Sequence, residues 1–200
     1  MGDAGAAAGA AAVPARRKRA FDWDAWAGAG AAAPENKTKR TPPRFVSVLT
    51  EKYGDLFGAL NDDEEECTSL AHCVSLDLAM GRGIAKEFKM RFGGVEELKR
   101  KATKVGETVS LDLSREGQCV YYMITKEKYF GKPTYETLGA ALESLKDLCV
   151  TNGTRRVAMP RIGCGLDRLD WPRVRDLILE TFSGTKMEIV VYQMDTPSDG

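Results

Sequence analysis

The sequence predicts an α/β fold in which helices cover both faces of a mixed sheet. Two observations indicate this class. From residue 44 onward, strand-like and helix-like segments follow one another in the order β, β, α, β, β, α, β, α, β. Residues 68–75 form a nearly continuous apolar run, which is typical of a strand that is buried on both faces. Ligands bind beyond the carboxyl ends of strands in such sheets, so residues at those ends are candidates for a site.

A long helical segment follows the first two strands. Apolar residues recur near one stripe over residues 84–102, which predicts a helix, and the Gly93-Gly94 pair is expected to divide it. The strands around this helix are expected at residues 45–50, 68–75, 108–113 and 118–126, the last two joined as a hairpin by the turn 114–117.

Two further helices and two strands complete the pattern. Leucines and alanines recur at helical spacing over residues 134–149, with Thr134 as the expected N-cap and Asn152-Gly153 as the end. A last helix is expected over residues 170–182, capped by Asp170 and with a proline in its first turn. The remaining strands are expected at residues 155–162 and 188–193.

The chain is expected to contain one folded domain with unstructured ends. Residues 1–43 are a low-complexity segment of Ala, Gly and Pro with basic clusters. Such a segment buries too little apolar surface to fold, so we expect a disordered N-terminal tail. Residues 44–194 form the domain, and residues 195–200 a flexible C-terminus. With 43% hydrophobic residues in a chain of 200, the domain can build a sizeable core.

Charge and cysteine content limit the expected partners and compartment. Lys and Arg number 29 and Asp and Glu also 29, so net charge predicts no general affinity for nucleic acid or membranes. Five cysteines without short paired spacing predict a reducing, intracellular location, and we expect a monomer without a membrane span. Arg16-Arg17-Lys18-Arg19 is read either as a nuclear signal or as part of a solvated tail. A cytoplasmic location and a mitochondrial transit peptide stay open.

Two glycine turns are candidate phosphate sites. Met80-Gly81-Arg82-Gly83 leads into a helix, whose free N–H groups and positive dipole end can receive a phosphate. Gly163-Cys164-Gly165 follows a strand, and its glycines allow a ligand to approach the backbone closely. Taken alone, the first turn is better explained as an ordinary connection between elements.

Lys126 and Asp167 are the candidate catalytic pair. Lys126 ends an apolar strand, so we expect its amine to be partly desolvated and able to act as a nucleophile. Asp167 follows the second glycine turn and can serve as a general acid or base. The alternatives are a solvated lysine, and an aspartate that only pairs with Arg161 or Arg168.

A rival hypothesis is a Cys164–His72 dyad. Cys164 lies in a loop where a thiolate can be stabilised, but the dyad requires the single histidine of the chain to reach it. His72 lies within an apolar strand, where a role in the core or the pocket wall is the simpler interpretation. One histidine and scattered cysteines lack metal-ligand spacing, so we expect no metal.

Seven segments, taken in order, match one known family. They are Tyr53-Gly54-Asp55-Leu56-Phe57 and residues 69–75, 80–85, 92–95, 121–126, 132–136 and 159–169. Together they resemble the macrodomain family over residues 45–193, and within it the enzymes that remove terminal ADP-ribose from proteins and deacylate O-acyl-ADP-ribose. The resemblance implies a three-layer α/β/α macrodomain that needs no cofactor and binds ADP-ribose and ADP-ribosylated proteins.

The resemblance also implies roles for individual residues. Lys126 would attack the anomeric carbon of the distal ribose and displace a glutamate or aspartate carboxylate, while Asp167 moves protons. Asp55 and the backbone of Leu56 would contact adenine. The other implied ligand contacts are His72, Ser75, Gly81, Gly83, Ile84, Thr125, Pro160, Ile162, Gly163, Cys164, Gly165 and Leu166.

Two alternative functions stay open. One is a noncatalytic ADP-ribose reader, which would keep the glycine turns and perform no chemistry. The other is hydrolysis of ADP-ribosylated guanine in DNA, which would make nucleic acid a partner. Residues 127–131 differ in character from the family pattern, so the target preference stays open as well. Together with a nuclear location, the resemblance implies reversal of ADP-ribosylation in the DNA damage response.

Overall fold

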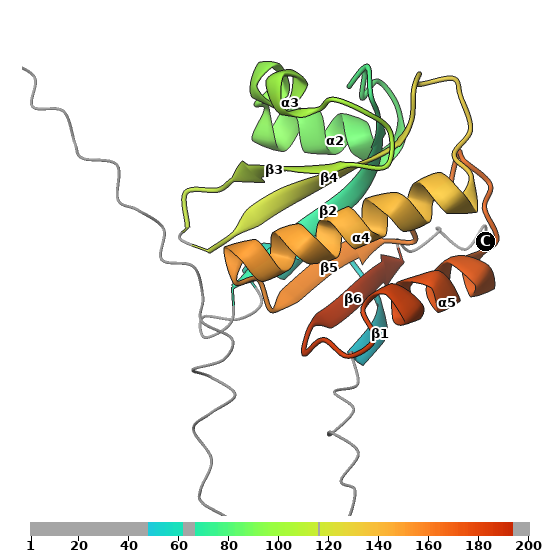
Figure 1. Cartoon of the computed structure of the whole chain (residues 1–200). Helices are drawn as coiled ribbons and strands as arrows, with labels where there is room; N and C mark the ends of the chain where they lie inside the picture. Colours follow the sequence, from blue (N-terminus) through green and yellow to red (C-terminus); the bar gives the residue numbers. More distant parts are fainter. Residues whose placement is uncertain (1–47, 62–66, 116, 194–200) are drawn as a thin grey trace, which may run out of the picture.

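A six-stranded sheet forms the centre of the molecule (Figure 1). The structure is a computed structural model that describes residues 48–61, 67–115 and 117–193. The expected tail over residues 1–43 with its basic cluster, and the expected C-terminus over residues 195–200, lie outside the described residues. The strands are β1 (Val48–Tyr53), β2 (Thr68–Ser75), β3 (Thr108–Asp112), β4 (Cys119–Lys126), β5 (Arg156–Pro160) and β6 (Glu188–Gln193).

The sheet is mixed, as the sequence predicts. Its strand order is β1-β6-β5-β2-β4-β3, and every neighbouring pair is parallel except β3–β4, which forms the predicted antiparallel hairpin. Crossover connections between parallel strands need room for helices, which is why helices lie on both faces.

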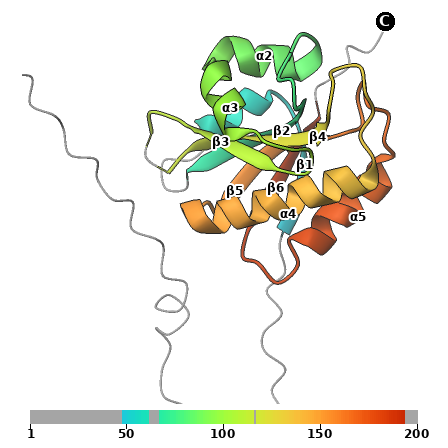
Figure 2. The same cartoon turned by 45° about the horizontal axis from the view of Figure 1, so that its top comes forward.

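Helices cover the sheet in two groups (Figures 1 and 2). One face carries a 3-10 helix, η1 (Leu56–Leu60), together with α2 (Gly83–Phe92) and α3 (Val95–Lys101). The other carries α4 (Tyr135–Asn152) and α5 (Trp171–Thr181). A separate apolar core fills the space on each side. The predicted three-layer α/β/α fold is therefore confirmed.

Local sequence signals explain where the helices begin and end. The backbone N–H of Thr137 donates to Thr134 Oγ1, and that of Thr134 donates to Thr137 Oγ1, so the predicted cap of α4 is confirmed. Gly153 ends α4 in the left-handed conformation at φ 69°. Gly94, at φ 65°, separates α2 from α3, and a side chain there would collide with Leu111.

Two expectations about elements are corrected. Asp170 stands at the N-cap position of α5, but its side chain makes no capping hydrogen bond. The first strand was expected to end at Thr50, whereas β1 continues to Tyr53, because its pairing with β6 extends to the register Tyr53↔Gln193. The expected residues 45–47 of this strand lie outside the described residues. None of the helices in the described part of the chain is long and apolar enough to cross a membrane.

The sheet brings three strand ends together. β2 and β4 pair in parallel and finish side by side, with Ser75 opposite Lys126 after a shift in register at Val74. β5 pairs with the other edge of β2, so the loop that follows Pro160 leaves the sheet at the same end. The candidate lysine and the candidate aspartate loop thus start from nearby strand ends.

Candidate active site

A cavity of about 770 Å³ opens beyond the carboxyl ends of β2 and β4. Its size is that of a pocket for a small organic ligand. Its walls are the end of β2 with the loop into α2, the loop after β4 and the loop after β5. The lining residues are 73–75, 79–82, 85, 126, 129–132 and 165–168.

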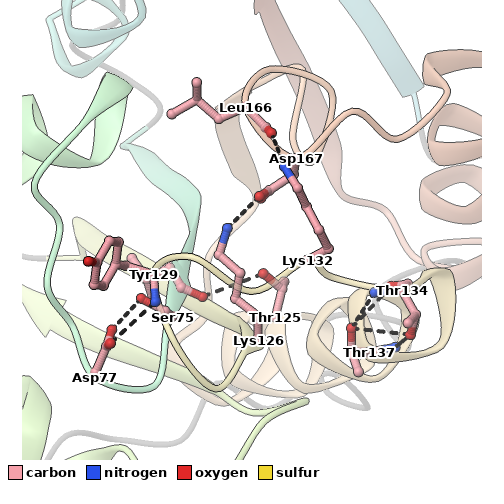
Figure 3. A network of polar contacts seen from close by, with 11 residues as sticks. Ser75, Asp77, Thr125, Lys126, Tyr129, Lys132, Thr134, Thr137, Leu166 and Asp167 are labelled. Atoms are coloured by element: carbon pink, nitrogen blue, oxygen red, sulfur yellow. Dashed lines mark hydrogen bonds and ion pairs between the residues drawn. The ribbon is translucent and has the colours of Figure 1, made fainter.

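Lys126 and Asp167 meet in this cavity (Figure 3). The Lys126 ammonium donates a hydrogen bond to Asp167 Oδ1, and the two groups form an ion pair. Each side chain is only 14% exposed. Both side chains are therefore largely buried. A carboxylate in contact with an amine can take its proton and leave a neutral nucleophile.

The loop that carries Asp167 is held by backbone geometry. Gly163 has φ 72°, and its carbonyl accepts a 2.8 Å hydrogen bond from the N–H of Leu169. A Cβ added at Gly163 would lie 2.7 Å from Leu169 Cδ1, so any other residue would be strained at this φ and would displace the Leu169 side chain. At Gly165, by contrast, an added Cβ would meet open space. The loop is thus closed behind Gly163 and open toward the cavity at Gly165.

The loop into α2 presents a free helix N-terminus. Arg82 is the N-cap residue of α2 and makes no side-chain capping bond. Gly83 begins the helix at φ 57°. The first N–H groups of α2 are therefore not capped by the Arg82 side chain and can bind an anion.

Backbone strain gathers in the same loops. In the described residues, the positive φ angles of residues other than glycine are those of Leu78 (49°), Met80 (43°) and Arg168 (60°). All of them lie in the loops after β2 and β5 that border the cavity. Such strain persists only where surrounding structure enforces it, and it is found most often at functional sites.

Asp77 joins two of the cavity loops, and sequence analysis missed it. Ser75 Oγ donates to Asp77 Oδ1 at 2.5 Å, and the N–H of Tyr129 donates to Asp77 Oδ2 at 3.2 Å (Figure 3). The N–H of Leu76 donates to the carbonyl of Lys126 at 2.8 Å. Burial opposes the charge of Asp77, but hydrogen bonds from Ser75 and from backbone N–H groups outweigh it and lower the pKa of this carboxyl. Asp77 is therefore an anion, and its carboxylate holds the loop after Lys126 in place.

The predicted site residues divide into two sets. Asp55, assigned to adenine, caps η1, because the N–H of Phe57 donates to its Oδ1 at 3.0 Å. The residues that line the cavity are Ser75, Gly81, Lys126, Gly165, Leu166 and Asp167. Those outside its lining are Asp55, Leu56, His72, Gly83, Ile84, Thr125, Pro160, Ile162, Gly163 and Cys164.

The structure does not support the Cys164–His72 dyad. His72 is fully buried and stacks on Phe88 of α2, with ring centroids 3.8 Å apart. Burial lowers the pKa of His72 to about 3. Cys164 packs against the core on the opposite face of the sheet, and its thiol donates to the carbonyl of Ile162 at 3.3 Å. Burial raises the pKa of Cys164 to about 11, so a thiolate is disfavoured.

Several cavity residues were not predicted from the sequence. Arg82, Lys132 and Arg168 add positive charge to the lining, and Tyr129 and Phe130 add exposed aromatic rings. The adjacent aromatic pair in an otherwise polar segment was the available signal. Within the described part of the chain, no three His, Cys, Asp or Glu residues are grouped in a way that could hold a metal ion.

Comparison with known proteins identifies the family. The Macro domain family model matches residues 71–178. The chain is a macrodomain. It is 47% identical over 148 residues to human ADP-ribose glycohydrolase OARD1. The matched residues cover 74% of this chain and 93% of that relative. Among solved structures, it resembles the macrodomain of Mycobacterium tuberculosis DarG, with a TM-score of 0.63 and 26% identity, over 73% of this chain and 97% of that one.

A second solved structure supports the fold. Thermosipho africanus DarTG in complex with ADP-ribose has a TM-score of 0.59 and 18% identity to this macrodomain, over 76% of this chain and 43% of that one.

Proposed function

We propose that this macrodomain hydrolyses the ester that joins ADP-ribose to glutamate or aspartate side chains of proteins, and that it also deacylates O-acyl-ADP-ribose. The observation that carries the proposal is the contact between Lys126 and Asp167 inside the cavity. Two relatives that share 47% of their residues with the chain over 148 positions are named ADP-ribose glycohydrolases, which supports a hydrolase.

The diphosphate would lie between the two glycine turns. The start of α2 offers N–H groups without a side-chain cap, and Gly165 leaves open space beside the backbone. Arg82 and Arg168 line the cavity and add positive charge to it. The solved complex of a structurally similar macrodomain protein with ADP-ribose supports this ligand. The distal ribose would then lie at the Lys126 end of the cavity.

The chemistry follows from the contact between the two groups. Asp167 takes a proton from the Lys126 ammonium, and the neutral amine attacks C1″ of the distal ribose. The bond between C1″ and the acceptor oxygen breaks, and the carboxylate leaves with the electron pair. Asp167 passes its proton to solvent and, as a carboxylate, takes a proton from the attacking water. The water oxygen bonds to C1″ as the C1″–N bond breaks and its electron pair returns to nitrogen, which releases ADP-ribose. The proton on Asp167 then passes to the amine and restores the Lys126 ammonium. A carboxylate is a good leaving group, so an amine and one acid suffice.

The test is a release assay on a protein that carries mono-ADP-ribose on glutamate. The Lys126→Ala variant should lose more than about 100-fold in rate, because it lacks the nucleophile. Lys128→Ala is the matched control, since Lys128 is an exposed lysine of the same loop that does not line the cavity. It should keep the rate of the unaltered chain.

Three outcomes would overturn the proposal. Tight ADP-ribose binding without release from any ester would make the chain a reader module. If Lys126→Ala releases ADP-ribose as fast as the unaltered chain, the lysine is not the nucleophile. Faster release from ADP-ribosylated guanine in DNA than from protein would instead make nucleic acid the substrate.

A further inference from the structure

Three exposed apolar side chains border the cavity. Tyr129, Phe130 and Leu166 are 63%, 73% and 66% exposed, and all three line the cavity. We call these three side chains the acceptor rim. The other exposed large hydrophobic residues in the described part of the chain are Tyr53, Met90 and Val150, and none of them lines the cavity. Exposed apolar side chains that border a cavity are typical of a binding surface.

The backbone holds this rim in place without a partner. The N–H of Tyr129 is bound by Asp77, and the N–H of Gly131 donates to the carbonyl of Lys128 at 2.9 Å. Lys132 Nζ donates to the carbonyl of Leu166 at 2.6 Å, which ties the two loops of the rim together (Figure 3). Little ordering is then needed when a ligand binds.

The rim lies where the leaving group must depart. Tyr129 follows Lys126 by three residues in the loop after β4 (Figure 3). Leu166 directly precedes Asp167, and its side chain extends toward Gly83, since a Cβ at Gly83 would lie 3.6 Å from Leu166 Cδ1. In the proposed reaction the bond to the acceptor breaks beside these two catalytic groups. The diphosphate and adenine lie at the other end of ADP-ribose. The part of the substrate nearest Tyr129 and Phe130 is therefore the acceptor.

Charge indicates what kind of acceptor fits. Four cations line the cavity, Lys126, Arg82, Lys132 and Arg168, against the single acid Asp167. The diphosphate accounts for only part of this excess. Arg82 and Arg168 are exposed. An acidic acceptor segment would complement the remaining charge.

The shape of the rim favours an aliphatic group over a flat one. The rings of Tyr129 and Phe130 lie 5.2 Å apart at 85° to each other. Perpendicular rings cannot enclose a base between parallel faces, whereas the corner between them suits a branched side chain. We propose that the acceptor rim binds acidic protein segments that carry a branched aliphatic side chain next to the modified glutamate. This inference rests on the proposed function, because it assigns the acceptor of that reaction.

The experiment compares two peptides with the full chain. Both carry mono-ADP-ribose on one glutamate within an acidic sequence, and they differ only in Leu or Gly beside that glutamate. The unaltered chain should hydrolyse the Leu peptide with a kcat/KM about 10-fold higher. In the double variant Tyr129→Ala, Phe130→Ala this ratio should fall to about one. Met90→Ala is the control, because Met90 is 75% exposed on α2 and outside the cavity, and it should keep the ratio.

Binding to the Lys126→Ala variant separates this inference from the reaction itself. That variant should bind the Leu peptide more tightly than the Gly peptide, and adding the two aromatic substitutions should remove the difference. Equal values for both peptides in the unaltered chain would overturn the rim as an acceptor site. An equal loss on both peptides in the double variant would show that the rings contact ADP-ribose itself. If no ester is hydrolysed but the Leu peptide still binds more tightly than the Gly peptide, only the proposed function is contradicted.

Discussion

At the scale of single residues, Gly163 is the one most closely tied to the geometry of the site. It keeps Asp167 next to Lys126, because its φ of 72° closes the loop and its Cα approaches Leu169. Gly163→Ala should lower the free energy of unfolding by about 1–2 kcal/mol, since alanine is strained at that φ. Chemical denaturation of both proteins measures this loss.

Gly165→Ala is the matched control for this prediction. Gly165 has no positive φ, and a Cβ there meets nothing within 4 Å. Its substitution should change the free energy of unfolding by less than about 0.5 kcal/mol. Equal losses at the two glycines would contradict the account of the loop.

The pairing of Lys126 with Asp167 could be predicted from the sequence, while the contacts that support it could not. Lys126 ends a strand with a clear apolar pattern and Asp167 follows another, so their meeting at one edge of the sheet was expected. Asp77 was missed because its partner Tyr129 lies 52 residues away, and only the folded loops bring the two together. Arg161, considered as a partner for Asp167, binds Glu51 at 2.9 Å instead.

At the scale of elements, α4 depends on its first turn. Thr134→Ala should remove the acceptor Oγ1 for the N–H of Thr137, while the N–H of residue 134 can still donate to Thr137 Oγ1, and it should lower the free energy of unfolding by about 1 kcal/mol. The comparison is Asp170→Ala at the same position of α5, where the side chain makes no capping bond. Asp170→Ala removes only a negative charge near the N-terminus of α5, so it should lower the free energy of unfolding by about 0.3 kcal/mol. Thermal unfolding of the two variants tests the difference, and a larger loss at Asp170 would contradict it.

Elements with strong periodic patterns were predicted well, and those shaped by neighbours were not. β2 and β6 match the expected residues 68–75 and 188–193, because both are apolar runs with clear ends. η1 was missed, since five residues carry too little periodicity to indicate a 3-10 helix. The end of β1 was placed too early, because its last residues are polar and are held in the sheet by pairing with β6.

At the scale of the whole molecule, the buried histidine makes stability depend on pH. The pKa of His72 is lowered by burial from 6.5 to about 3 in the folded state. Between these values the unfolded chain binds a proton that the folded chain does not. The free energy of unfolding therefore has its full value, as far as His72 is concerned, above pH 6.5. It falls as the pH drops toward 3, by up to about 1.4 kcal/mol per pH unit.

A variant isolates this effect, because the chain has one histidine. Unfolding by denaturant should show the loss between pH 7.5 and pH 5, a range above the titration of ordinary carboxyl groups. His72→Leu should remove most of this slope. A slope that is unchanged in His72→Leu would assign the pH dependence to other groups.

The proposed function requires the fold to bring the Lys126 amine and the Asp167 carboxyl group to the end of the cavity that would hold ADP-ribose. The direct test is the covalent intermediate. Asp167→Ala is incubated with a peptide that carries ADP-ribose on glutamate, quenched, digested and examined by mass spectrometry. We predict ADP-ribose on the fragment that contains Lys126, and none when Lys126→Ala is added. Substrate binding by Asp167→Ala without any adduct at Lys126 would contradict the central claim.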